Sequence, residues 1–315
     1  MPETLDFLLA FGITEHPKDF HYSGFRSEMN LNEDPNRLLL ETLGRSGRDL
    51  RLCHVLKSVE RVNPARATQQ NWPWTLRPTV TYHSFDVETE QSVWLIVKAN
   101  SLIKKRITSA CEDQKLYRNN SKDASLSINA FESTLRTHLI LCAWAGENWR
   151  WYINFIEEQV QLLTRMTLIE SMDDEPTEAA LPKVNTTSQT SEPLEKSGLS
   201  SASSSFEHLQ QVHWVEEKAN EALLVLRANM FVIQELRTFY SEAQHALDTA
   251  ENCIKPAPEP MAMFQRQLNV IVKDMDMQQS RIQMLLQLLG DRRALVSHPL
   301  HSWSYLATQA MLTHG

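Results

Sequence analysis

Two long apolar seams in the C-terminal half constrain this sequence more than any other feature. Apart from one longer gap in each seam, apolar side chains recur there every three or four residues, a spacing that places them along one face of an α-helix. The first seam consists of Val212, Val215, Ala219, Leu223, Leu226, Met230, Ile233 and Tyr240. The second consists of Phe264, Leu268, Ile271, Met275, Ile282, Leu285 and Leu289. The pattern predicts two long amphipathic helices, each with one face that packs against another helix.

Local signals predict where these helices begin and end. Ser205 is a candidate N-cap, so the first helix is expected over 206–252. Three closely spaced prolines end it, and the second helix is expected from Met261 to about Arg293, with Pro299 ending the regular structure. Gln278 falls in the second seam, where a polar residue either sets the register of an assembly or is tolerated as a partly exposed side chain.

Strand patterns lie nearer the N-terminus. Loose alternation over Arg51–Arg61, followed by Arg77–Phe85, predicts two strands. Ser92–Lys98 is apolar on both faces, which favours a buried central strand. The short polar link Asp86–Glu90 predicts a hairpin-like connection between the last two strands.

Changes in composition along the chain predict its division into parts. These are a strand-containing α/β head (1–130), an aromatic-rich helix of that head (131–170), a disordered linker rich in Ser, Thr, Glu and Pro (171–205), a long helical stalk region (206–295) and an irregular tail (296–315). Gly146 is expected to dent or break the aromatic-rich helix. The fold class is therefore expected to be α+β and mostly helical, with a small sheet in the head and long, stalk-like antiparallel helices after it.

Charge and composition exclude several classes of protein. A net charge of −8 and a pI near 5.8 argue against nucleic acid as the main partner. No run of apolar residues reaches the roughly 18 that a membrane span needs, and the N-terminus lacks the pattern of a secretory signal. The four cysteines show neither metal-type pairs nor a disulfide framework. The chain as written is therefore expected to be cytoplasmic, with reduced thiols.

The residue types and spacings that carry catalysis are not found in the sequence. There is no phosphate-binding loop and no nucleophile elbow, and no nucleophile, base and orienting group can be nominated together. His54, His83 and His138 lie in apolar surroundings, where hydrogen-bonded structural histidines are favoured over ligands. The acidic run 173–175 is favoured as a solvated surface over a magnesium site. We therefore expect no enzyme and nominate no catalytic or cofactor-binding residue; metal ligands stay unknown.

A series of motifs in a fixed order carries a family resemblance. The segments are Trp72–Thr79, Tyr82–Asp86, Val93–Lys98, Glu147–Asn154, Glu217–Leu226 and Gln279–Ile282 with Leu285-Leu286. Together they resemble the fungal CorA-like transporter-domain proteins, relatives of the CorA magnesium channels. The resemblance spans roughly residues 15–295, excluding the linker. The combination is fairly specific, whereas any one piece is not.

The resemblance implies a cytosolic α/β head followed by stalk helices. In the parent family the stalk continues into a pore helix that ends in Gly-Met-Asn, a second membrane helix follows, and five subunits form a ring gated by metal bound between the heads. This sequence departs from that pattern, because it has no membrane helix and no pore signature, and Ser297–Gly315 reads as unrelated sequence. We expect either a truncated gene model or fragment, or a soluble paralogue that retains only the head.

The expected function follows from the resemblance. It is a CorA-like cytosolic domain of a divalent-cation (magnesium) transporter, with a regulatory and assembly role and no conduction of its own. No cofactor is implied, although magnesium is a candidate regulatory ion. The expected partners are further copies or full-length CorA-like subunits, bound through the helices, and the location is membrane-associated if the chain is part of a full-length transporter. The alternative is a stand-alone soluble helical scaffold that shares the fold.

Overall fold

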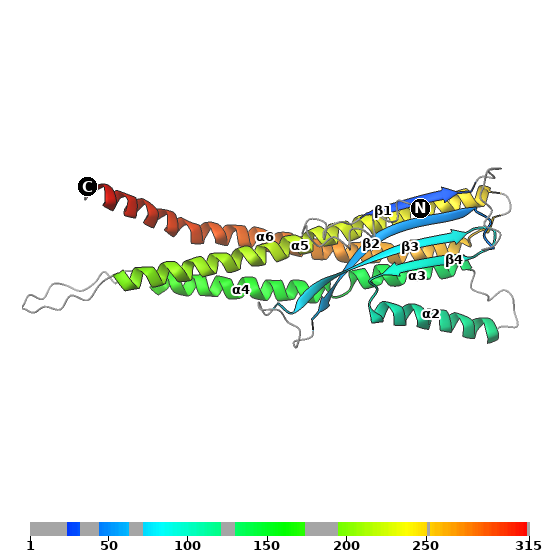
Figure 1. Ribbon diagram of the computed structural model, residues 1–315, viewed down its shortest axis with the longest axis horizontal. Coiled ribbons are helices and arrows are strands. Elements are labelled where there is room, and N and C mark those ends of the chain that lie inside the picture. The colour runs from blue at the N-terminus through cyan, green and yellow to red at the C-terminus, as the bar shows by residue number, and fades with distance from the viewer. Residues whose placement is uncertain are drawn as a thin grey trace, which may run out of the picture. The chain divides into compact units, whose positions relative to one another are not determined.

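One antiparallel sheet is followed along the chain by long helices (Figure 1). The structure, a computed structural model, describes residues 24–31, 44–62, 72–120, 130–173, 195–250 and 253–313. The strands are β1 (Phe25–Asn30), β2 (Asp49–Arg61), β3 (Trp74–Asp86) and β4 (Ser92–Val97). The helices are α2 (Ser101–Asn120), α3 (Ala130–Gly146), α4 (Trp149–Asp173), α5 (Glu195–Thr249) and α6 (Pro258–Thr313). The expected α+β, mostly helical class is confirmed.

The four strands form an antiparallel meander in the order β1-β2-β3-β4. The three predicted strands are β2, β3 and β4, and the predicted hairpin-like link between β3 and β4 is confirmed. In that link the Asp86 carboxylate accepts hydrogen bonds from the backbone N–H groups of Glu88 (3.1 Å) and Thr89 (3.0 Å). Such side-chain bonds to the following backbone stabilise a tight turn. Glu90 has a φ of 58°, the left-handed conformation that completes the reversal.

Two features of the sheet differ from the sequence prediction. The expectation that Ser92–Lys98 is a buried central strand was wrong, because β4 lies at the sheet edge and Val93 and Leu95 are each 47% exposed. An apolar run on both faces therefore does not by itself separate a central strand from an edge strand. The second feature is β1, which the sequence did not predict. Most of its residues are exposed and polar, so it lacks the apolar alternation that marks a strand.

On one face of the sheet α3 packs against β2, and Phe239 of α5 contacts Phe25 of β1 with ring centroids 6.4 Å apart (Figure 1). Successive side chains of a strand alternate between faces, so Leu50, Leu52 and Leu56 of β2 lie on the same face, and all three are buried. Phe85 of β3 contacts Phe131 of α3 edge to face, with ring centroids 5.6 Å apart. This face and the helices over it form the main apolar core of the head.

Backbone groups of β2 beyond the end of β1 are hydrogen-bonded by other parts of the chain. The side-chain amide of Asn229 in α5 donates to the carbonyl of Lys57 (2.6 Å) and accepts from its N–H (3.0 Å). Asn148 donates from its side chain to the carbonyl of Val59 (3.1 Å), and the N–H of Val55 donates to the Gly24 carbonyl (3.1 Å). Exposed strand edges promote unwanted strand pairing, so these bonds both satisfy and cover the edge.

The predicted interruption at Gly146 is confirmed by the end of α3 at that residue. Asn148 follows with a φ of 65°, and α4 then begins at Trp149. The turn is tied to α2, because the Arg106 guanidinium pairs with the Glu147 carboxylate through two hydrogen bonds. The start of α2 is capped by the Asn100 side chain, which accepts from the N–H of Ile103 at 2.8 Å.

The long helices extend beyond their predicted ends. The predicted start of the first at 206 was wrong, because α5 begins at Glu195. Ser is only moderately worse than Ala inside a helix, and each added residue contributes a backbone hydrogen bond once a helix exists. The predicted linker thus overlaps α4 at 171–173 and α5 at 195–205, while 174–194 lies outside the described residues.

The predicted end of the second helix was also wrong, because α6 runs from Pro258 through Pro299 to Thr313. Proline is well tolerated in the first turn of a helix, where its missing N–H has no helical partner, which explains the earlier start. Inside a helix a proline removes one hydrogen bond and bends the axis, and the helix can continue beyond it. The predicted irregular tail 296–315 is therefore helical up to residue 313.

Both predicted seams are buried faces of their helices. Residues of α5 and α6 that are almost fully buried include Ala219, Leu226, Ile233 and Tyr240 from the first seam and Phe264, Leu268, Met275, Ile282 and Leu289 from the second. Gln278 is buried too, so its interpretation as a partly exposed residue was wrong. The amphipathic pattern thus located the core-facing side of each helix correctly.

The residues group into two compact units. The first comprises 1–152 with 224–279, and the second comprises 153–223 with 280–315. Within the second unit, Arg281 of α6 donates to the side chains of Asn154 and Glu157 of α4, both at 2.8 Å. Arg293 of α6 pairs with Glu216 of α5 at 2.9 Å. The domain boundaries given from the sequence stay a prediction.

Candidate functional site

Three histidines meet between the sheet and α3, and we call them the histidine cluster. His54 lies in β2 and His83 in β3, where Leu52 pairs with His83, so both imidazoles project from the same face. His138 projects from α3 onto this face. Its ring centroid is 5.7 Å from that of His54 and 5.1 Å from that of His83. All three side chains are buried.

Aromatic rings surround the histidine cluster. Trp94 of β4 stacks on His83 with ring centroids 4.0 Å apart and lies 4.7 Å from His138. Tyr240 of α5 contacts His138 at 5.5 Å and also packs on Phe264 of α6 at 5.3 Å. The cluster is therefore a titratable centre inside an aromatic core to which three strands and three helices contribute.

Burial keeps the imidazoles neutral. It lowers the pKa of His54 and of His83 to about 3, since an interior position disfavours the charged ring. The pKa of His138 is lowered well below its usual value, by burial first and then by the other two histidines. The six ring nitrogens have no hydrogen-bond partner within the described residues. The sequence thus predicted the apolar surroundings correctly, whereas the hydrogen bonds expected of structural histidines are not found in this part of the chain.

The cluster could not have been assembled from the sequence alone. His54 and His83 lie in strands whose register was not known, and His138 lies on a helix about 50 residues further along the chain. A signal was nevertheless present, because each histidine occupies an apolar position of a strand or helix pattern. Among the described residues, no group of three or more His, Cys, Asp or Glu side chains could hold a metal ion.

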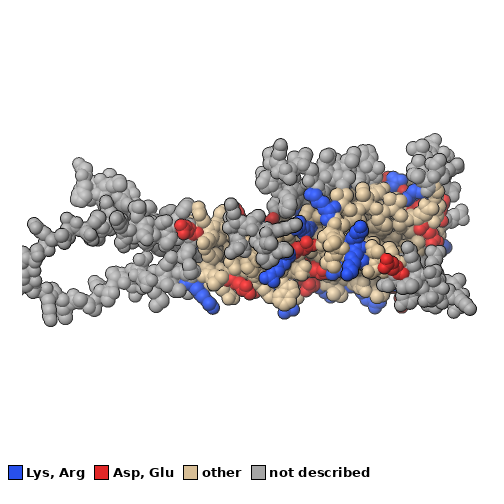
Figure 2. Space-filling view, turned by 60° about the horizontal axis from the view of Figure 1, so that its bottom comes forward, with Lys and Arg blue, Asp and Glu red and all other residues tan. Residues whose placement is uncertain are grey.

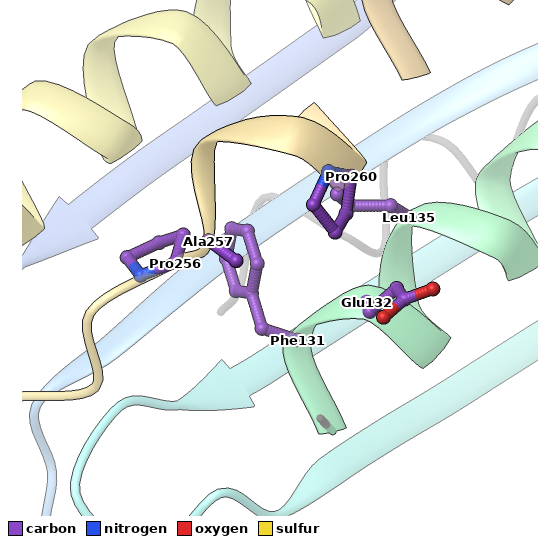
Figure 3. Close-up of a pocket in the computed structure, with 6 residues that line it drawn as sticks. All are labelled: Phe131, Glu132, Leu135, Pro256, Ala257 and Pro260. Carbon is purple, nitrogen blue, oxygen red and sulfur yellow. The ribbon is translucent and has the colours of Figure 1, made fainter. Parts of the chain in front are cut away.

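A small apolar pocket lies where α3 begins (Figure 3). Phe131, Glu132 and Leu135 line it from α3, and Pro256, Ala257 and Pro260 line it from the connection to α6 and its first turn. The carboxylate of Glu132 is already paired with Arg136 at 2.7 Å. The pocket offers apolar surface and one engaged carboxylate, a lining typical of a packing gap beneath a chain connection.

The motif segments singled out from the sequence meet in space. Trp72 and Trp74 of the first motif lie 6.0 and 5.8 Å from the ring of Tyr152, which belongs to the Glu147–Asn154 motif. Arg281 of the last motif binds Asn154 of that same segment, as described above. Each of these contacts lies within one compact unit, so the named segments contribute side chains to the packing inside their units.

Residues 1–168 match the family model described as CorA-like transporters. The chain belongs to the CorA-like family. A comparison with curated proteins gave no match. The matched range of this CorA-like chain ends within α4, so it holds the sheet, α2, α3 and the histidine cluster. Across the part that the structure describes, no helix combines the length and apolarity needed to cross a membrane.

The helices of the CorA-like chain also carry apolar side chains on their solvent side. Met263, Val270, Met277 and Met284 recur every seven residues of α6 and are more than half exposed, with Val270 at 67% and Met284 at 72%. We call these four residues the apolar stripe. A spacing of seven residues keeps side chains on one helical face over several turns. On α5, Leu224 and Phe231 show the same spacing and are about half exposed.

Charged groups on the CorA-like surface are mixed in sign. Figure 2 shows basic and acidic side chains interspersed on the face in view. The sequence holds two short basic clusters, Lys104–Arg106 and Arg292-Arg293. In the first, Lys104 and Lys105 are exposed, while Arg106 is paired with Glu147. Arg293 of the second cluster is paired with Glu216. The acidic run 173–175 falls almost wholly outside the described residues.

Proposed function

We propose that this chain acts as the CorA-like cytosolic domain of a divalent-cation transporter, with magnesium as the ion. Its role is regulatory and structural, and ions are not conducted by this chain itself. The match of residues 1–168 to the CorA-like transporters is the observation that carries the proposal. The order of the motif segments and the residues within them favour a fungal origin. Within a full-length transporter the domain is membrane-associated on the cytosolic side.

The proposed assembly role is supported by the apolar stripe on α6. A helix that packs only within its own chain gains nothing from exposed Met and Val side chains at a constant spacing of seven. Where parallel helices are arranged around a symmetry axis, the same face of each helix points towards that axis, so one stripe per chain supplies every side of the central contact. We therefore propose further copies of this chain, or full-length CorA-like subunits, as partners bound through the helices.

We propose a non-enzymatic role. The buried polar centre of the head consists of imidazoles held neutral among aromatic rings. Acid–base catalysis needs a group whose pKa lies near the working pH and which a substrate can reach. Neither condition fits the histidine cluster, whereas a packing role does.

The first test is the molar mass of the purified chain by multi-angle light scattering, with and without millimolar magnesium. We expect a defined oligomer whose mass or thermal stability responds to magnesium, because a ligand bound by the folded state stabilises it. Calcium and potassium at matched ionic strength serve as controls. A monomer that is indifferent to magnesium would contradict the proposal and support the alternative, a stand-alone helical scaffold.

A matched pair of variants tests whether the apolar stripe makes the assembly. Met284→Asp places a charge within the stripe, and Gln283→Asp places the same charge at the preceding, exposed position, about 100° away around the helix. We expect the first variant to weaken self-association at least tenfold and the second to leave it nearly unchanged. Sedimentation velocity over a concentration series measures both. Equal effects of the two variants would show that the stripe is not the contact.

A further inference from the structure

The histidine cluster differs from an ordinary apolar core because its side chains can take up protons in acid. The ring centroid of His138 lies 5.1 Å from that of His83 and 5.7 Å from that of His54, at the contact between α3 and the strands β2 and β3, and all three side chains are almost fully buried. A proton taken up there creates a charge in an interior that solvates charge poorly. Two protons also repel each other at this separation, so charging the cluster is compatible only with an open contact.

Within the part of the chain that the structure describes, the groups that contact the cluster offer no counter-charge. His54 comes from β2 and His83 from β3, and β4 contributes the neutral Trp94. On α3, Cys142 lies one turn beyond His138, and burial raises the pKa of its thiol to about 12. From α5, burial raises the pKa of Tyr240 well above its usual value, so its hydroxyl is neutral as well.

Among the described residues, the charged group that acts on the cluster makes protonation harder. Arg45, which precedes β2, lowers the pKa of His83 through its positive charge. Its guanidinium is held by the Ser84 hydroxyl at 2.8 Å and lies 3.8 Å from the Asp49 carboxylate. The described groups that contact the imidazoles are therefore neutral, and the Asp49 carboxylate is paired with Arg45 and not with a histidine, so charged imidazoles are stabilised by contact with water.

We propose that the histidine cluster is an acid-sensitive switch, which holds α3 against β2 and β3 while its imidazoles are neutral and releases α3 when they are protonated. The switch lies inside the CorA-like head, and its action needs no second chain. Its test is made on the isolated chain and does not depend on the proposed transport function.

Proton linkage gives the size of the expected effect. A histidine that changes from a pKa of about 3 in the closed head to about 6.5 in water favours the open form about 30-fold more at pH 5.0 than at pH 7.5. Three such groups acting together give a change on the order of 10⁴-fold. Because the pKa of each histidine is lowered in the closed head, the closed form is fully favoured above pH 6.5 and is lost as the pH falls below that value.

The experiment measures opening of α3 by native-state hydrogen exchange at pH 7.5 and pH 5.0, with rates corrected for the intrinsic pH dependence. We expect the protection of the α3 amides to fall on the order of 10⁴-fold, and that of the 264–278 segment of α6 to fall much less. His138→Leu removes one titrating group and is expected to reduce the fall for α3 to on the order of 10³-fold. His213→Leu, at an exposed position of α5, is the matched control and is expected to behave as the wild type.

Several results would overturn the switch. One is an equal loss of protection in α3 and α6, which would mean uniform acid unfolding. Another is an unchanged pH response in His138→Leu; should that variant fail to fold at pH 7.5, His54→Leu takes its place. The third needs no variant: if NMR of ring-labelled histidine shows the buried imidazoles titrating near pH 6.5 while α3 stays protected, the closed head tolerates the charge.

Discussion

Two asparagines show how single side chains hold the head together at the residue scale. A sheet edge left without a neighbouring strand needs partners for its N–H and C=O groups, and a side-chain amide is the one neutral side-chain group that donates and accepts much as a peptide does. Asn229 uses both functions on Lys57, whereas Asn148 uses only its donor on Val59. Asn229 is therefore the more sensitive position.

The first prediction concerns this amide. Asn229→Ala leaves the N–H and C=O of Lys57 buried without their partner, and it should lower the free energy of unfolding by about 2–4 kcal/mol. Urea denaturation measures the change. Asn220→Ala is the matched control, because its side chain is exposed and bonds only within α5, to the Glu216 carbonyl; we expect a change below about 0.5 kcal/mol. Similar losses in both variants would refute the role of the edge contact.

The second prediction concerns Asp86 and pH. Burial disfavours its charged form, but hydrogen bonds from Thr89, Ser46 and Glu88 outweigh burial, so the pKa of the carboxyl lies below its usual value. A lowered pKa means that the carboxylate stabilises the fold above about pH 4, and that this contribution is lost as the pH falls through the folded-state pKa. Asp86→Asn should therefore cost about 1–3 kcal/mol at pH 7.

The measurement for Asp86 is the difference in unfolding free energy between wild type and Asp86→Asn. It should be largest at neutral pH and should shrink as the pH falls from about 4 towards the lower folded-state pKa, because the unfolded chain then binds a proton that the folded carboxylate does not. A difference that stays constant between pH 7 and pH 3 would show that the variant acts through lost packing rather than lost charge.

At the scale of elements, the close approach of α3 to α6 depends on Gly146. A Cβ atom built at this position would lie 3.3 Å from Cγ2 of Ile271 and 3.6 Å from the Met275 methyl. The first distance is tight, and the second is ordinary contact. A larger side chain at the end of α3 would therefore have to push α6 aside.

The third prediction compares two glycines. Gly146→Val should destabilise the chain by about 1–3 kcal/mol, since overpacking displaces the neighbouring helix. Gly290→Ala should instead stabilise it by about 0.5–1 kcal/mol, because a Cβ there meets nothing within 4 Å and alanine is a better helix former. Thermal unfolding measures both changes. Destabilisation by Gly290→Ala, or no effect of Gly146→Val, would contradict the packing described.

The elements that the sequence predicted well are those whose pattern reflects a buried face. The alternation in 51–61 and the two seams of α5 and α6 located β2 and the helix faces, because apolar burial is periodic. The strand β1 was not predicted, because its side chains are mostly exposed and no apolar period marks it. The helix ends were misplaced at Ser205 and Pro299, where local preference is weak compared with the continuity of a long helix.

The candidate site was predictable only in part. Each histidine of the cluster was noted from the sequence, but their meeting depends on strand register and on how α3 lies across the sheet, and a single sequence does not encode these in any local pattern. The apolar stripe was visible in the printed sequence, yet only the burial of the neighbouring seam shows that the stripe faces solvent.

For the whole molecule, the four free thiols report how far the chain is folded. Cys111 is exposed, Cys253 is partly exposed, and Cys53 and Cys142 are buried. Burial raises the pKa of Cys53 and of Cys142 to about 12, which suppresses the reactive thiolate.

The fourth prediction is therefore a graded thiol titration. With a disulfide reagent at pH 8, Cys111 should react rapidly and Cys253 more slowly, while Cys53 and Cys142 should react only as the chain unfolds. Absorbance of the released thiol gives the rates, and denaturant should bring all four to a similar rate. Rapid reaction of Cys53 or Cys142 without denaturant would mean that the core is open in solution.

The pairing of Asn229 with Lys57 also sets the position of α5 along the sheet. If α5 moved by one helical turn, Val225 or Ile233 would replace Asn229, and neither side chain can bond the strand. These two hydrogen bonds therefore fix the position of α5 along β2. Any displacement of α5 along the strand requires both bonds between Asn229 and Lys57 to break.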